Sequence, residues 1–115
     1  EKMAEFINPI AKLGDHMTKF TTEIGFKGMQ NPDEVGAAAV DYLRVAGHLV
    51  FGYLFARMAQ VALREIAAGN TDPFYGAKLQ TARFYFAKLF PETATLMRTA
   101  RAGSKVLMDT DLALA

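Results

Sequence analysis

The residues that could perform chemistry in this chain are few and far apart. Its two histidines are His16 and His48, and the residues three positions before them are Leu13 and Val45. The Glu-x-x-His pairs of two-metal helical bundles are therefore missing, and there is no cysteine to act as a thiolate ligand or nucleophile. Two imidazoles without a paired carboxylate are poor evidence for zinc or iron. We predict no metal site and interpret His48 as a hydrogen-bonded structural residue in preference to a ligand or base.

The carboxylates have simple structural roles in the expected helices. Glu34 and Glu92 each lie in the first turn of a helix, where a negative charge stabilises the helix dipole. Asp41 and Arg44 are three residues apart and are expected to form a surface ion pair. The sequence also lacks a Gly-rich phosphate loop, a Gly-x-Ser-x-Gly elbow and a dinucleotide fingerprint. We therefore assign no catalytic, cofactor-binding or metal-binding residue.

An aromatic stretch, "TARFYFAKLFPET" at 81–93, is the most distinctive surface candidate. Consecutive residues on a helix point in different directions, so Phe84 and Tyr85 cannot both share the face of Phe86. Coverage by the long second helix is the simpler interpretation for any single ring. Contact with another chain or domain is the alternative.

Basic residues accompany these rings. Residues 73–108 contain six Lys/Arg and one Asp/Glu, whereas residues 1–72 contain seven Lys/Arg and nine Asp/Glu. A solvated helix face is the simpler interpretation, and binding of substrate phosphates or of an acidic partner surface is the alternative. The acidic remainder of the chain argues against nucleic-acid binding. The candidate docking face consists of Lys78, Arg83, Phe84, Tyr85, Lys88, Arg98, Arg101 and Lys105.

Four helical segments are expected to position these residues. The first begins at Asn8 and Pro9, or continues from a short preceding turn, and ends before Asn31. The second begins at "NPDE" and ends at Gly69. The third begins at "DPF", 72–74, and we expect a kink or break at residues 90–91 because proline cannot continue the helical hydrogen bonding. A fourth helix then continues from "PETATL", with residues 96, 100, 103 and 107 facing inward.

The second helix is unusually apolar. Its centre, 49–56, is apolar on every side, so we expect neighbours to cover it all round. Gly36, Gly47 and Gly52 would each cost about 1 kcal/mol relative to alanine in an exposed helix, so we expect close approach of another backbone at these positions. No segment shows strand alternation. The fold class expected is all-α: an up-and-down bundle of three long helices, or four if the third breaks at Pro91.

Length and composition fit a single helical domain over residues 1–115. The longest apolar run has twelve residues, against the roughly 20 that span a membrane, so we expect no membrane span. The lack of cysteine is compatible with a cytoplasmic protein. The chain begins with Glu1 rather than methionine, which favours a piece of a longer protein.

Three stretches resemble a known family: "NPDEVGAAAVDYLRVAGHLVFGYLFARMA", "FYGAKLQTARFYFAKLFPET" and "RAGSKVLM". They are similar to the extra C-terminal helical domain of long acyl-CoA dehydrogenase-like flavoproteins, the group that includes methylthiopropanoyl-CoA dehydrogenase. The similarity covers most of the chain and is strongest over 31–108. It implies a C-terminal fragment of a longer flavoenzyme.

The resemblance implies that the parent enzyme uses FAD to introduce a double bond between Cα and Cβ of an acyl-CoA, in fatty-acid or related metabolism. It implies no cofactor in this fragment, because that chemistry belongs to a preceding core. The family's catalytic glutamate does not correspond to Glu34, Glu65 or Glu92. The partners implied are the catalytic core of the same polypeptide, further copies in a homo-oligomer and the parent's acyl-CoA substrate. A free-standing helical binding or adaptor module without catalytic activity is the alternative.

Overall fold

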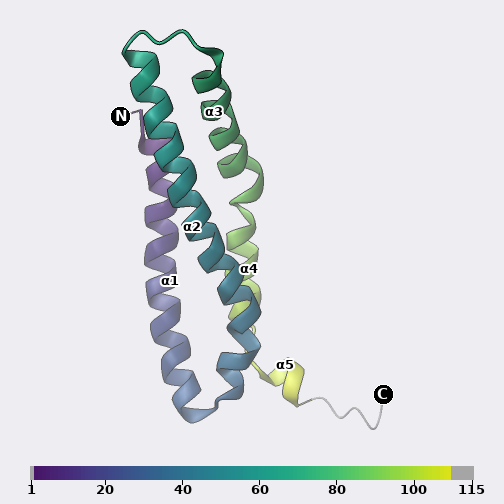
Figure 1. Ribbon diagram of the computed structural model, residues 1–115. Helices are drawn as coiled ribbons and strands as arrows, with labels where there is room; N and C mark the ends of the chain where they lie inside the picture. The colour runs from purple at the N-terminus through teal and green to yellow at the C-terminus, as the bar shows by residue number, and fades with distance from the viewer. Residues whose placement is uncertain (1, 110–115) are drawn as a thin grey trace.

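The computed structural model describes residues 2–109 and is all-α, which confirms the expected fold class. In Figure 1, α1 and α2 are antiparallel, and the segment from α3 to α4 returns alongside α2. The helix contacts are concentrated on α2, which packs on α1, α3 and α4. The helices are α1 (Ala4–Gln30), α2 (Asp33–Ala67), α3 (Pro73–Phe84), a π-helix η1 (Tyr85–Leu89), α4 (Glu92–Ala100) and α5 (Lys105–Met108).

Local signals fix most helix ends where the sequence places them. The Asn31 side chain accepts a hydrogen bond from the Asp33 backbone N–H at 3.1 Å, and Gly69 has φ +92° beyond the end of α2. Asp72 caps α3 by accepting from the Phe74 N–H at 2.9 Å. For α1, the second alternative holds: the helix begins at Ala4, and Pro9 lies inside it. Pro9 is close enough to the start that only one backbone bond, to the second helical residue, is lost.

The third segment breaks at Pro91, as predicted, and a π-helical turn precedes the break. The Phe90 N–H donates to the Tyr85 carbonyl, five residues back, at 2.9 Å, so the chain forms a π-helical turn before Pro91. A new helix then begins at Glu92. The wider turn changes the direction of the side chains that follow α3. Tyr85, the first residue of this turn, lies three residues after buried Ala82 and points into the core.

The fourth helix is shorter than predicted. It ends at Ala100, and Gly103 adopts φ +86°, a left-handed conformation that favours glycine and ends helices. The Ser104 side chain and backbone N–H both donate to the Glu34 carboxylate, which joins this turn to the start of α2. The predicted inward line through Gly103 and Leu107 is therefore wrong, and Leu107 is exposed on α5.

The core runs along one side of α2. Gly52 is closely packed, but by side chains rather than by the backbone that we expected: a Cβ there would lie 3.2 Å from Phe90 Cε2 and 3.3 Å from an Ile10 side-chain carbon. Gly36 and Gly47 have no neighbour within 4 Å of that position, so the prediction of close approach is wrong there for the single chain. The buried apolar residues are Phe6, Leu13, Met17, Phe20, Ala38, Val45, Ala56, Ala59, Ala62, Leu79, Ala82, Tyr85, Phe90, Met97 and Ala100.

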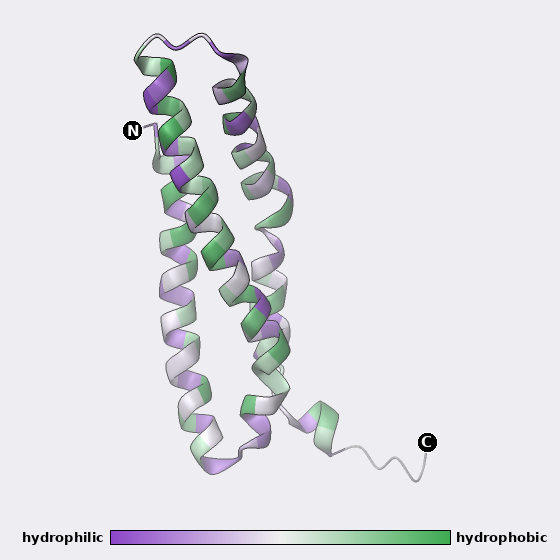
Figure 2. Ribbon diagram, in the orientation of Figure 1, coloured by the Kyte–Doolittle hydropathy of each residue, from purple (hydrophilic) through white to green (hydrophobic). Residues whose placement is uncertain are grey.

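The opposite side of α2 is not covered. Figure 2 shows that hydrophobic residues follow this helix along most of its length. Within the described chain, Val50, Phe51, Tyr53 and Leu54 are all more than half exposed, so complete coverage of the helix centre is a wrong prediction. By length and composition alone, α2 could cross a membrane, a property that core helices of soluble proteins share. The lack of a membrane span stays a prediction.

Candidate functional site

Several exposed apolar residues of α2 lie in one stripe along the helix. We call this stripe the α2 face and define it as Val40, Leu43, Gly47, Val50, Leu54 and Val61. Their spacings of three, four, three, four and seven residues place them on one side of a helix. Val40 is 79% exposed and Leu43 is 74% exposed. A row of this length goes beyond the single exposed apolar side chains that are normal on a monomer.

Burying the α2 face against another protein surface would be favourable. Each of its large aliphatic side chains contributes about 1.5–3 kcal/mol on full burial. The sequence analysis identified the apolar centre of this helix but attributed its coverage to the bundle itself. The sequence does contain a signal for the α2 face. Its apolar residues also repeat every three or four positions, on the side of the helix opposite the core residues.

A hydrogen-bonded cluster joins α2 to the segment from η1 to α4. His48 Nδ1 lies 2.7 Å from the Tyr85 hydroxyl, and His48 Nε2 lies 2.6 Å from Glu92 Oε2. Arg44 donates to both Glu92 carboxylate oxygens, at 2.8 and 3.2 Å. Asp41 instead accepts from the Thr99 hydroxyl at 2.8 Å, so the predicted Asp41–Arg44 pair is wrong. Both arrangements connect different helices, which local spacing does not reveal.

The charged and polar groups of this cluster stabilise one another. Hydrogen bonds from Arg44 and then His48 lower the pKa of Glu92 to about 2, so Glu92 remains an acceptor at neutral pH. A carboxylate can only accept, so His48 donates to it from Nε2. Burial raises the pKa of Tyr85 to about 12, with the charge of Glu92 as a second cause. His48 is hydrogen-bonded at both ring nitrogens, as its interpretation as a hydrogen-bonded residue predicts.

The predicted docking residues do not form one surface. Tyr85 is only 3% exposed and is stacked on Phe55 in the core, which corrects its assignment to an external face. A hydrogen bond between its hydroxyl and the His48 ring holds it against α2. Phe84 is 56% exposed and stays available for contact. Lys78 lies over the ring of Phe74 at 5.2 Å.

Two of the predicted arginines are engaged within the bundle. Arg83 forms a bidentate pair with Glu5 of α1, at 3.1 and 3.0 Å. Arg101 lies 3.4 Å from the carboxylate oxygens of Glu23 and 5.2 Å over the ring of Phe20. These contacts tie the end of α3 and the end of α4 to α1. Lys105 is exposed on α5, away from the bundle.

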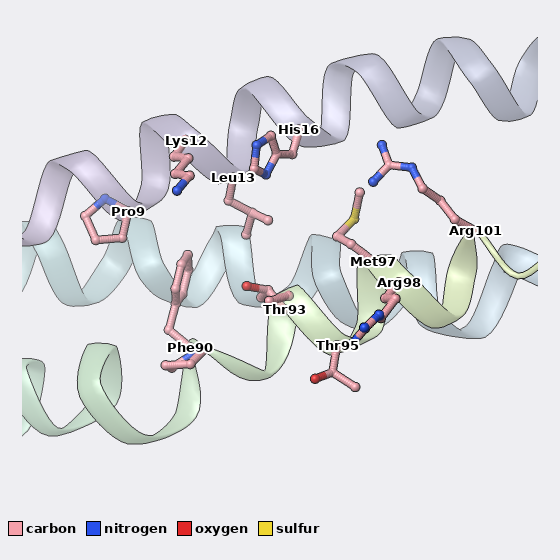
Figure 3. Close-up of a pocket in the computed structure, with 12 residues that line it drawn as sticks. Pro9, Lys12, Leu13, His16, Phe90, Thr93, Thr95, Met97, Arg98 and Arg101 are labelled. Carbon is pink, nitrogen blue, oxygen red and sulfur yellow. The ribbon is translucent and has the colours of Figure 1, made fainter.

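The other two cations line separate grooves. Lys88 borders a groove of about 460 Å³ that also contacts Arg44 and His48. Arg98 borders an open groove of about 680 Å³ between α1 and α4, where Lys12 and His16 approach from the other side (Figure 3). Its walls include Leu13, Phe90 and Met97. The cations therefore face in different directions, and their role in docking stays a prediction.

The described residues do not fit a flavin or metal site. Between residues 2 and 109 there is no group of three or more His, Cys, Asp or Glu side chains that could hold a metal ion. No buried side-chain nitrogen or oxygen in this part of the chain lacks a hydrogen-bond partner. A flavin site would need polar groups directed at the ring system from an enclosing cavity. The two hollows described above are instead open grooves.

Comparison with known proteins gives a family match for the chain. No curated protein matches the chain. A family model described as "Acetyl-CoA dehydrogenase C-terminal like" matches residues 1–111, almost the whole sequence. The chain therefore belongs to this family of C-terminal domains of acetyl-CoA dehydrogenase-like proteins.

Proposed function

We propose that the chain is the accessory C-terminal domain of an FAD-dependent acyl-CoA dehydrogenase and that it serves docking and assembly. The observation that carries this proposal is the α2 face, an apolar stripe that the bundle leaves exposed. Such a stripe is typical of a surface that another protein covers. Family membership supports the parent enzyme, because the matching model describes a C-terminal domain.

Chemistry is assigned to the rest of the parent polypeptide. Three glutamates that do not correspond to the family's catalytic glutamate are each engaged in a contact within the chain. Glu92 is paired with Arg44, and Glu34 accepts from Ser104. Glu65 accepts from the Asn70 side chain at 3.1 Å. FAD binding and Cα–Cβ dehydrogenation of the acyl-CoA are therefore functions of the core, and this domain contributes contacts.

The basic residues supply a second part of the docking proposal. Lys88 and Arg98 are exposed, and neither forms an ion pair among residues 2–109. Exposed cations of this kind affect the rate and orientation of association with an acidic surface. We assign them to contact with the catalytic core. Charge reversal of Lys88 and Arg98 in the parent enzyme is expected to weaken that contact, more strongly at low salt. Unchanged assembly and turnover would refute their role.

The test of the assembly function is a charge on the α2 face. Leu43→Asp in the parent enzyme is expected to reduce assembly, measured by sedimentation velocity, because a buried carboxylate would be unpaired. Thr22→Asp is the matched control, since Thr22 is exposed on α1 and its side chain bonds only its own helix. Equal assembly of both variants with the unmodified enzyme would refute the proposal.

The assignment of chemistry is tested separately with the chain alone. Titration with FAD and with acyl-CoA, followed by flavin absorbance and calorimetry, is expected to show no tight flavin complex and no oxidation. A one-to-one flavin complex would place the cofactor site in this chain and overturn the assignment.

A further inference from the structure

We propose that the α2 face packs against the same face of a second copy of this chain, antiparallel, about a two-fold axis between His48 and Leu49. This inference rests on the proposed assembly function and names the partner of that surface. A two-fold contact uses the same surface on both copies, so each residue must suit its opposite number in the other chain. The α2 sequence meets this condition from end to end.

The α2 face has the seven-residue repeat of a two-stranded coiled coil. Val40, Gly47, Leu54 and Val61 repeat every seven residues, and a second series three positions later repeats in the same way. The second series contains Gly36, Leu43, Val50, Arg57 and Arg64. A strict seven-residue repeat keeps one seam directed at a partner helix over many turns. The bundle's own core uses the other side of α2.

One antiparallel register pairs every position of the two series. In this register, residue i of one copy faces residue 97 − i of the other copy. Each member of one series therefore faces a member of the other series. Leu43 then faces Leu54 of the second copy, and Gly47 faces Val50 of the second copy. The Arg57 stem faces Val40, while its guanidinium donates to the Tyr53 hydroxyl of its own chain at 2.8 Å. Long side chains commonly cover apolar surface in this way.

Charge supports the antiparallel direction. In this register, Asp33 at the start of α2 faces Arg64 of the second copy, and the symmetry repeats the pair at the other end. Neither residue forms an ion pair within the described chain. Residues 33–48 of α2 carry three acids and one arginine, whereas residues 49–67 carry two arginines and one glutamate. Parallel pairing would place like charges together, which is unfavourable at an interface.

The same register accounts for two glycines that the single chain leaves unexplained. Gly36 and Gly47 lie in a helix and have no neighbour within 4 Å of a Cβ position. Each costs about 1 kcal/mol relative to alanine. In the pair, Gly36 faces Val61 and Gly47 faces Val50 of the second copy. Close approach of the two helices at these small residues compensates for the cost.

Cysteine crosslinking in the parent protein distinguishes this pairing from other modes of docking. This chain contains no cysteine, so the introduced thiols are the only ones in the domain, and any outside it are first replaced. In the proposed pair, the two copies of residue 50 are three residues apart along the helix axis, about 4.5 Å, and the two copies of residue 40 are about 25 Å apart. We expect Val50→Cys to form a covalent dimer with a short bismaleimide, and Val40→Cys to stay uncrosslinked.

Each outcome has one interpretation. Crosslinking of both single variants would indicate parallel pairing and overturn the proposal. A double variant, Leu43→Cys with Leu54→Cys, places a thiol of one copy opposite a thiol of the other. It tests the pairing independently of the local geometry at residue 50. Failure of this double variant and of Val50→Cys would overturn self-pairing. If Leu43→Asp still abolished assembly in that case, the α2 face would remain a docking surface with a different occupant.

Discussion

Removal of one buried hydroxyl tests how the π-turn is held on α2. Tyr85→Phe keeps the ring that stacks on Phe55 at 4.5 Å but deletes the hydroxyl that lies 2.7 Å from His48 Nδ1. The same hydroxyl also lies 3.2 Å from the His48 carbonyl oxygen. The substitution therefore leaves the ring nitrogen of a largely buried histidine without a partner.

The magnitude follows from that unsatisfied group. A buried polar atom that loses its hydrogen-bond partner costs about 1–3 kcal/mol. The aromatic contacts of Tyr85 remain, so no cavity contribution is added. We expect the free energy of unfolding to fall by about 1–3 kcal/mol, which lowers Tm by roughly 4 °C or more per kcal/mol in a domain of this size.

The assay is equilibrium urea unfolding followed by circular dichroism. Tyr53→Phe is the matched control, because the Tyr53 ring is 52% exposed and its hydroxyl accepts only from Arg57 of the same helix. The control is expected to change stability by no more than about 0.5 kcal/mol. Equal stability of Tyr85→Phe and the unmodified chain would refute the account of this cluster, and so would an equal loss in both variants.

Three further results are expected from the packing and charges of the bundle. Gly52→Val is expected to lower the free energy of unfolding by about 1–3 kcal/mol, because the added side chain overpacks this site. Gly25 has open space around it, so Gly25→Ala is expected to raise the free energy of unfolding by up to about 1 kcal/mol. Urea unfolding measures both changes. Hydrogen bonds from Arg44 and then His48 lower the pKa of Glu92 from its ordinary 4.5 to about 2, so the stabilisation from Glu92 is present above pH 4.5 and is lost as the pH falls through about 2. Glu92→Gln should flatten this part of a stability–pH curve. Glu5→Gln breaks the exposed ion pair with Arg83. We expect the free energy of unfolding to fall by under about 1 kcal/mol at low salt and by less at high salt, because solvent and dissolved ions screen an exposed pair.

The sequence predicted those features that depend on a few adjacent residues. The caps at Asn31 and Asp72, the end at Gly69 and the break at Pro91 each follow from local backbone chemistry, and the structure confirms them. The all-α class follows from the same signals. The end of the fourth helix was not predicted, because the pattern of apolar residues continues past Gly103. The positive φ of Gly103 is incompatible with a continuing helix.

The features missed depend on contacts between distant residues. The pairing of Arg44 with Glu92 spans 48 positions, and no spacing rule favours it over the nearby Asp41. The burial of Tyr85 depends on its contacts with Phe55 and His48 of α2, which are distant from it in the sequence. The exposure of the α2 face could be recognised only once the three neighbours of α2 had been placed on its other side.

The most direct test of the account is the accessibility of the α2 face in the assembled parent protein. Leu43→Cys and Thr22→Cys are labelled with a maleimide, and their rates are compared with those of an unfolded reference. We predict that the labelling rate at residue 43 is reduced at least about tenfold more than the rate at residue 22. A tenfold reduction corresponds to a free energy of about 1.4 kcal/mol for exposing the covered face. Equal labelling rates at the two positions would show that the face stays open to solvent and would contradict its role in assembly.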